Sequence, residues 1–182
     1  MANIDITRPI VEGFEGGFQN YKTDKMNYTK DGTLVGTNKG VSANLYESLF
    51  GFTPTVDDLM NITDEQIDQV FETFAKAICF DDINNQSIAN LWFDWVWASG
   101  GYYPNEHVQK ILGVSVDGIV GSGTIDALNN FPDQEDLFNQ IKQARLDYID
   151  SVIAENPSDS EYKEDWVGRV NAYTYCQANQ TA

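Results

Sequence analysis

The sequence has few basic residues for its length. Its 182 residues include 11 lysines and arginines against 28 aspartates and glutamates, which gives a formal net charge of −17. Because phosphate recognition needs a basic surface, this balance excludes ordinary nucleic-acid binding. The deficit is uneven, since residues 1–50 hold five basic and six acidic side chains and the rest of the chain carries −16. We interpret this near-neutral segment as the place where a partly anionic polymer docks; the alternative is that the acidic side chains elsewhere only solvate helices.

Cysteine and histidine are also scarce. Cys79 and Cys176 lie far apart without Cys-x-x-Cys spacing, and His107 is the single histidine. This pattern argues against a zinc site, and we predict neither a metal nor an organic cofactor. A disulfide between the two cysteines is left open, although free cysteines are commonly small buried apolar groups.

Long apolar runs are missing as well. No stretch approaches the roughly 20 apolar residues that cross a bilayer. The start of the chain, residues 1–5, lacks the basic and apolar regions of a secretory signal. We therefore expect no membrane insertion, and delivery by a separate route such as a membrane lesion, a virion, a secretion channel or a signal since removed. Hydrophobic residues make up 42% of the chain, enough for one compact body that we expect to be a monomer.

The first 40 residues predict a helix, a polar loop and a hairpin. Apolar residues recur at helical spacing near the start: Ile6, Ile10, Val11 and Phe14. Pro9 fits the first turn and Gly16-Gly17 supply a stop, which places Glu15 at the C-terminal end of this helix. Residues 18–40 are rich in Asn, Asp, Thr and Gly, with a short alternating stretch at 33–37 that predicts a small β-hairpin.

Helices dominate from Ser42 onward. Residues 63–66 form a capping box before an amphipathic helix, and residues 86–99 are apolar on nearly all sides, which predicts a buried central helix with core tryptophans. Gly100-Gly101 and Pro104 break the pattern. A short unit follows, with helices at 107–112 and 124–129 around a turn at 113–121, and the last helices are predicted at 134–154 and 158–175, split by Asn156-Pro157.

Glu15 and Asp24 are the candidate catalytic carboxylates. Cleavage of a glycosidic bond needs an acid that protonates the leaving oxygen, and usually a second group that handles water or positive charge on the other face. A Glu beside two glycines, which let a sugar approach the backbone, suits a half-buried acid. A Glu-Gly-Gly triplet by itself is a weak signal.

Three neighbouring segments together resemble the signature of glycoside hydrolase family 108. They are Phe14 to Asn20, Asp24-Lys25 and Gly36 to Ser42. The family pattern runs Glu-Gly-Gly-aromatic, an Asp nine residues after the Glu, and then Gly-x-Thr or Gly-Thr followed by Gly and an aliphatic residue. In this sequence an insertion separates Asp24 from Thr37, and Met26 stands where a glycine is common. The resemblance implies a lysozyme-like N-acetylmuramidase; some family members carry the name secretion activator protein.

A second resemblance covers the C-terminal half. Residues 108–121, with Thr124 and Leu128 behind them, look like the motif of the peptidoglycan-binding domain that is paired with this family, and residues 166–171 are similar to its Trp-x-x-Arg-Val-Asn ending. The Asp117-Gly118 turn either orients two helices or contacts the wall directly. Arg169 either anchors a carboxylate inside the fold or touches substrate.

We therefore expect a mainly α, lysozyme-like fold with a small β-hairpin at the cleft and a C-terminal helical subdomain. The catalytic domain is predicted at 1–98 and the peptidoglycan-binding subdomain at 99–182. Glu15 would be the general acid, and Asp24 with Thr37 would position water or stabilise positive charge. The expected substrate contacts are Gly16, Gly17, Asn20, Asn38 and Lys39.

The expected reaction is cleavage of the β-1,4 bond between N-acetylmuramic acid and N-acetylglucosamine, at the bacterial cell wall or in the periplasm, by a phage endolysin or an enzyme exported by another route. Carboxylates roughly 6.5–9.5 Å apart predict inversion and 5–5.5 Å predict retention, which leaves both outcomes open. Three alternatives remain: a peptidoglycan-binding or phage structural module that no longer cuts, a regulatory or scaffolding protein with a stable protein partner, and a chitinase-like enzyme.

Overall fold

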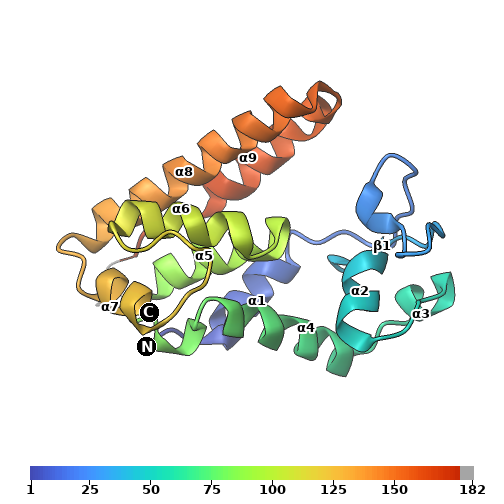
Figure 1. The fold of residues 1–182 in the computed structure, drawn as a ribbon, viewed down its shortest axis with the longest axis horizontal. Helices are drawn as coiled ribbons and strands as arrows, with labels where there is room; N and C mark the ends of the chain where they lie inside the picture. Colours follow the sequence, from blue (N-terminus) through green and yellow to red (C-terminus); the bar gives the residue numbers. More distant parts are fainter. Residues whose placement is uncertain (177–182) are drawn as a thin grey trace. The chain divides into compact units, whose positions relative to one another are not determined.

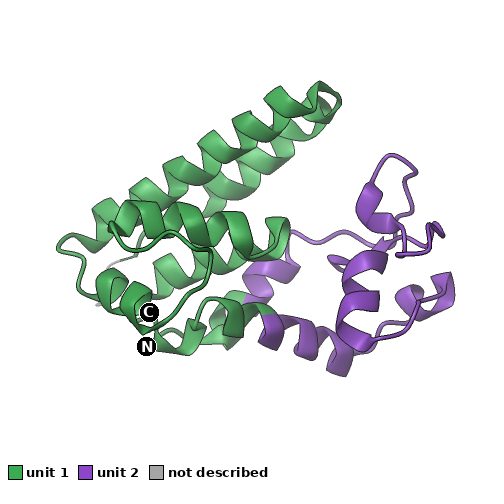
Figure 2. Ribbon diagram, viewed as in Figure 1, with its two compact units in different colours: residues 1–7, 74–182 green, residues 8–73 purple. Residues whose placement is uncertain are grey.

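The computed structural model describes residues 1–176 and is mainly α-helical, with one small β-hairpin (Figure 1). The predicted fold class is confirmed. The chain packs as two compact units, residues 8–73 and residues 1–7 with the chain from 74 onward (Figure 2). The predicted division of function between residues 98 and 99 stays a prediction, because packing does not show which part binds and which part cuts.

The unit of residues 8–73 carries the hairpin. Its elements are the end of α1 (Ile4–Glu12), η1 (Lys25–Asn27), β1 (Thr37–Asn38), β2 (Val41–Ser42), α2 (Ala43–Phe50), α3 (Val56–Met60) and the first part of α4 (Asp64–Ala77). The strands pair antiparallel, with Thr37 opposite Ser42 and Asn38 opposite Val41. The two residues between them, Lys39 and Gly40, have φ of 49° and 78°, as a type I′ hairpin turn requires. The predicted alternation at 33–37 therefore overlaps the hairpin only at Thr37.

The first helix ends earlier than predicted. Pro9 lies inside α1 and not in its first turn, and α1 stops at Glu12. The Gly13 N–H still bonds to the Pro9 carbonyl at 3.1 Å, which closes the last turn before the chain leaves the helix. Glu15 consequently lies three residues beyond α1, in the connection that follows it.

The start of α4 confirms the predicted capping box. The Gln66 N–H donates to the Thr63 hydroxyl at 3.2 Å, and the Thr63 N–H donates to the Gln66 side-chain oxygen at 2.9 Å. These two bonds satisfy donors that the first turn of a helix leaves without helical partners. They fix the point at which Asp64, the first residue of α4, enters the helix.

The other unit is built around α5 (Gln86–Ser99), whose bounds match the prediction. Trp92 and Trp95 have no exposed surface, so both are core residues as predicted. α5 packs against α6 (Tyr102–Leu112) and α8 (Gln134–Glu155), and α8 packs against α9 (Lys163–Ala172). The remaining elements of this unit are η2 (Phe80–Asp82), α7 (Ser122–Asn129) and η3 (Pro157–Tyr162).

Two predictions about helix boundaries in this unit are wrong. Pro104 does not break the chain but lies in the first turn of α6, where a missing N–H has no helical partner to lose. The segment from Ser158 to Tyr175 is not one helix, because it begins as η3 and is α-helical only in α9.

A buried ion cluster joins three helices of this unit. Asp94 of α5 has no exposed surface and accepts hydrogen bonds from Arg169 of α9 at 2.7–3.1 Å. The Arg145 Nη2 of α8 lies 2.8 Å from the same carboxylate. Of the two roles left open for Arg169, the structure supports the anchor inside the fold.

The Asp117-Gly118 turn is held against α6. The Gln109 side-chain oxygen accepts from both N–H groups of the turn at 2.8–3.0 Å, and its amide nitrogen donates to Asp117 at 2.8 Å. Gly118 has φ of 72°, and a Cβ there would lie 2.7 Å from the Tyr102 ring. The turn thus sets how the chain passes from α6 towards α7. Within residues 1–176, no helix is long and apolar enough to cross a bilayer.

Candidate functional site

Glu15 follows α1 in a tight turn. Its N–H donates to the Glu12 carbonyl at 3.1 Å, and the Phe14 N–H donates to the Val11 carbonyl at 3.0 Å. The Glu15 side chain is half-buried. Neither Gly16 nor Gly17 would bring an added Cβ within 4 Å of another residue, so the backbone beside Glu15 borders open space.

A cavity of about 290 Å³ lies in the unit of residues 8–73 and includes Glu15 in its wall. This volume is at the lower end of small-ligand sites, roughly 300–1,000 Å³. The lining residues are Glu12, Glu15, Gly16, Lys39, Asp64, Ile67 and Phe71. Carboxylates, one ammonium group and two almost fully buried apolar side chains of α4 thus meet in one concave site.

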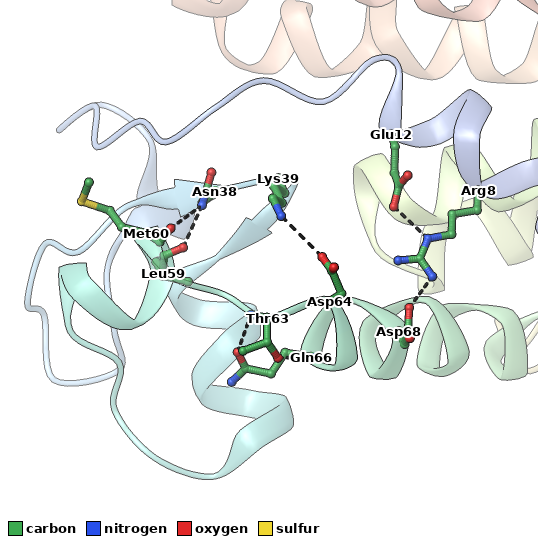
Figure 3. Close-up of polar contacts among 10 residues, drawn as sticks. All are labelled: Arg8, Glu12, Asn38, Lys39, Leu59, Met60, Thr63, Asp64, Gln66 and Asp68. Atoms are coloured by element: carbon green, nitrogen blue, oxygen red, sulfur yellow. Dashed lines mark hydrogen bonds and ion pairs between the residues drawn. The ribbon is translucent and has the colours of Figure 1, made fainter.

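The hairpin turn and α4 meet across this cavity. The Lys39 Nζ lies 3.8 Å from the Asp64 carboxylate, and both side chains are largely exposed (Figure 3). Such an exposed pair contributes little stability. Lys39 can therefore exchange Asp64 for an anionic group of a ligand at little cost.

Glu12 is engaged by Arg8. The Arg8 Nε donates to Glu12 at 2.8 Å, and a guanidinium nitrogen also bonds to Asp68 (Figure 3). The guanidinium lies 5.2 Å from the centre of the Phe71 ring. The pKa of Arg8 is raised, first by the hydrogen bond to Glu12, which offsets the opposing effect of burial. Glu12 therefore acts as a partner of Arg8.

Asp24 and Thr37 belong to a separate hydrogen-bond network in the same unit. Asp24 caps η1: one of its oxygens accepts from the Met26 N–H at 2.9 Å, and the other accepts from the Gln19 amide at 3.3 Å. The Thr37 hydroxyl donates to the side-chain oxygen of Asn27 at 2.7 Å. Gln19 and Asn27 connect the two predicted residues.

The predicted site residues thus fall into four groups. Glu15, Gly16 and Lys39 line one cavity, while Asp24 and Thr37 share the amide network. Gly17 and Asn20 are exposed and lie outside the cavity lining. Asn38 is buried, and its amide donates to the carbonyls of Leu59 and Met60 at the end of α3 (Figure 3). The Asn38 amide nitrogen therefore holds the fold, and its role as a substrate contact stays a prediction.

Several residues of the cavity and of the amide network were not singled out from the sequence, among them Asp64, Gln19 and Asn27. The sequence pattern predicts Asp64 only as part of a capping box at the start of a helix, and it does not indicate that Asp64 lines the cavity. Gln19 lies within the Phe14 to Asn20 segment but has no predicted role, and Asn27 is an uncharged amide in a polar loop without a recognisable signal. Among residues 1–176, no group of three or more His, Cys, Asp or Glu side chains is placed to hold a metal ion.

Comparison with known proteins finds two family models along the chain. The model described as Glycosyl hydrolase 108 matches residues 9–100, and the model described as Predicted Peptidoglycan domain matches residues 103–171. No curated protein sequence matches the chain.

A solved structure, that of Brucella abortus SagA, is similar to this chain with a TM-score of 0.72. The two sequences are 19% identical, and the match covers 96% of this chain and 97% of that chain. At this identity the likeness concerns the fold. The first family match spans half of the chain and contains the whole cavity lining. The chain therefore belongs to glycosyl hydrolase family 108, and it is a glycoside hydrolase with a peptidoglycan domain that acts on the bacterial cell wall.

Proposed function

We propose that this protein is an N-acetylmuramidase in which Glu15 is the general acid. The observation that carries the proposal is the half-buried Glu15 carboxylate in the wall of the cavity, next to Gly16 and within the segment that matches the hydrolase family. A carboxyl group that shares a cavity with buried apolar side chains and has open backbone beside it suits proton donation to a sugar oxygen.

The proposed reaction begins with transfer of the Glu15 proton to the oxygen between N-acetylmuramic acid and N-acetylglucosamine. The bond from that oxygen to the anomeric carbon breaks, and positive charge develops at the carbon. A water molecule held by Asp24 and Thr37 then forms the new bond to the carbon, and its proton passes to the Asp24 carboxylate. Atoms and charge balance as hydrolysis requires.

We propose that Lys39 and Gly16 contact the substrate directly. N-acetylmuramic acid differs from N-acetylglucosamine by a lactyl ether that carries a carboxylate or the peptide stem. The Lys39 ammonium group, whose partner Asp64 is 92% exposed, is available to pair with such an anion. Gly16 lets a pyranose ring approach the backbone beside Glu15. Gly17 and Asn20, on the exposed segment that follows, are proposed contacts for neighbouring sugars.

We further propose that residues 1–98 cut the glycan and residues 99–182 bind it. The family matches at 9–100 and 103–171 support this division. In the second segment, Val116 is 41% exposed and Ile119 is 74% exposed on either side of the Asp117-Gly118 turn. We propose that these apolar side chains contact the wall.

The test is digestion of purified sacculi by the wild-type chain, by Glu15→Gln and by a control, Glu65→Gln. Glu65 is exposed on α4 and outside the cavity lining, so its exchange removes one carboxylate without touching the site. Loss of a general acid typically lowers the rate by about 10²–10⁴. We expect reducing muramic acid ends from wild type and control, and none from Glu15→Gln. Binding of all three proteins to sacculi without release of such ends would show that the chain is a wall-binding module instead.

A further inference from the structure

We infer that Gln19 and Asn27 are positioning residues, which fix the direction of the Thr37 hydroxyl and hold the Asp24 carboxylate. The inference rests on the proposed function, in which Asp24 and Thr37 hold the attacking water. Neither amide needs to touch the substrate for this role.

The backbone brings Gln19 directly opposite Thr37. The Gln19 N–H donates to the Thr37 carbonyl at 2.9 Å, and the Thr37 N–H donates to the Gln19 carbonyl at 2.8 Å. The two backbone segments approach so closely that a Cβ on Gly36 would lie 2.5 Å from the Gln19 carbonyl oxygen. Gly36, with φ of 135°, is the residue that permits this approach.

Backbone groups fix the orientation of both amides. The Tyr21 carbonyl can only accept, so the Asn27 amide nitrogen that lies 3.0 Å away must be the donor. The Tyr21 N–H can only donate, so the Gln19 atom that lies 2.9 Å away must be the amide oxygen. The two side chains then bond to each other in both directions, at 2.8 and 3.1 Å.

These orientations decide what Thr37 and Asp24 can do. The Asn27 oxygen faces Thr37, so the Thr37 proton is committed to it and the hydroxyl can only accept from a water molecule. A water that donates to Thr37 keeps its own lone pairs for the anomeric carbon. The Gln19 nitrogen faces Asp24 and, together with the Met26 N–H, leaves one defined position for that carboxylate.

Asn27 lies in the segment that connects Asp24 to Thr37, and its side chain is fully buried. A connection without such an anchor would leave the relation between Asp24 and Thr37 loose. The segment instead places its own amide in the core of the loop, where the cost of leaving buried polar groups unpaired enforces one arrangement.

The sharpest variant is Gln19→Glu. A glutamate has the shape of glutamine, but its ionised form cannot donate to Asp24 and places a second negative charge beside it. Once protonated, the introduced carboxyl group can donate again through its hydroxyl. Because a neighbouring carboxylate raises the pKa of one member of such a pair, protonation occurs above the ordinary value of about 4.3.

The experiment measures kcat and KM on soluble glycan fragments from pH 4.5 to 8.5 for wild type, Gln19→Glu, Gln19→Leu and Gln69→Glu. Gln69 is exposed on α4 and serves as the matched control for the amide-to-acid exchange. The other charged and titratable side chains of the elements that form or pack against the network are Tyr21, Lys22, Lys25, Tyr28, Lys30 and Asp31 of the loop, Lys39 of the hairpin, and Tyr46 and Glu47 of α2, which packs against η1. All are common to the four proteins, so the ratio to wild type at each pH isolates the exchanged group.

We expect kcat of Gln19→Glu at pH 8 to fall by roughly tenfold to a hundredfold with little change in KM, as for a misplaced reacting group. The ratio to wild type should rise as the pH falls, whereas Gln19→Leu should stay low at every pH. Thermal unfolding at each pH shows which fraction of each variant is folded. If Gln19→Glu does not fold, Asn27→Asp provides a second test, because it loses and regains a hydrogen-bond donor with pH in the same way.

A ratio that does not change with pH, while wild type cuts and Glu15→Gln does not, would overturn the positioning role alone. An active Glu15→Gln would overturn the proposed function itself. The two failures are therefore distinguishable.

Discussion

Replacement of Asp94 should strongly destabilise the protein. Its carboxylate is fully buried and faces two guanidinium groups, Arg145 at 2.8 Å and Arg169 at 2.7 Å. Asp94→Asn preserves the shape of the side chain and removes its charge. The two arginines then remain in the interior without the carboxylate, and Arg145 is only 4% exposed, so water cannot replace it.

The magnitude follows from the cost of breaking a buried ion pair, roughly 3–5 kcal/mol. For a chain of this size each kcal/mol lowers Tm by roughly 2–4 °C, so we expect a decrease of roughly 6–20 °C. Burial lowers the pKa of Arg145, and Asp94 opposes that effect. In the variant Asp94 no longer offsets burial or the nearby charge of Arg169, both of which lower this pKa.

The assay is thermal unfolding of wild type, Asp94→Asn and Asp147→Asn. Asp147 is exposed on α8 and controls for the loss of one negative charge. Because Asp94 and Glu15 belong to different units, glycan cleavage well below the Tm should stay close to wild type. A Tm of Asp94→Asn within about 2 °C of the control would refute the reasoning, because surface changes alone are that small.

Four further perturbations test other parts of the molecule. Gly36→Ala should lower both Tm and kcat, since the new Cβ meets the Gln19 carbonyl at 2.5 Å and adds strain of roughly 1–3 kcal/mol; unchanged turnover would contradict the close approach. Lys39→Gln should slow cleavage of peptidoglycan by roughly two- to fivefold relative to chitin oligosaccharides, the scale of an exposed ion pair, and equal slowing of both substrates would argue against contact with the lactyl group. A thiol reagent at pH 8 should modify the exposed Cys176 quickly and Cys79 slowly, because burial raises the pKa of the Cys79 thiol and reduces its thiolate fraction. Equal rates of modification at the two cysteines would contradict this prediction. Activity on sacculi should rise with moderate salt, because added ions screen the net charge of −17 from the anionic wall. The Debye length shrinks from about 30 Å at 0.01 M to about 8 Å at 0.15 M. An activity that only falls from 10 mM upward would refute this prediction.

The sequence predicted best those elements whose signals are local. The Thr63 and Gln66 capping box needs only residues three apart, and it is present at the start of α4. α5 was predictable because a segment that is apolar all round has to be buried, whichever elements cover it. The tryptophans of α5 followed from the same argument.

Features that depend on pairing across the chain were not predictable. The hairpin turn uses Lys39 with φ of 49°, although glycine or asparagine is the usual signal for that position. Pro9 lies in the interior of α1, where packing outweighs propensity. Pro104 lies in the first turn of α6, where proline is tolerated. Gln19 becomes part of the site only because its backbone pairs with Thr37, and nothing in a single sequence reports that bridge.

Glu15 and the Asp24–Thr37 pair are held by different kinds of support. Glu15 is placed by the turn that closes α1, through the hydrogen bond from its N–H to the Glu12 carbonyl. Asp24 and Thr37 are placed by two amides whose direction backbone groups set. In the proposed mechanism, a defect in the amides should therefore slow the attack of water on the anomeric carbon. It should not shift the part of the pH profile that reports ionisation of the proposed acid, Glu15. If Gln19→Leu shifts the part of the pH profile that reports the proposed acid, then the contacts that hold Glu15 and those that hold Asp24 and Thr37 are coupled. The proposed acid and the proposed water-holding groups would then respond as one unit.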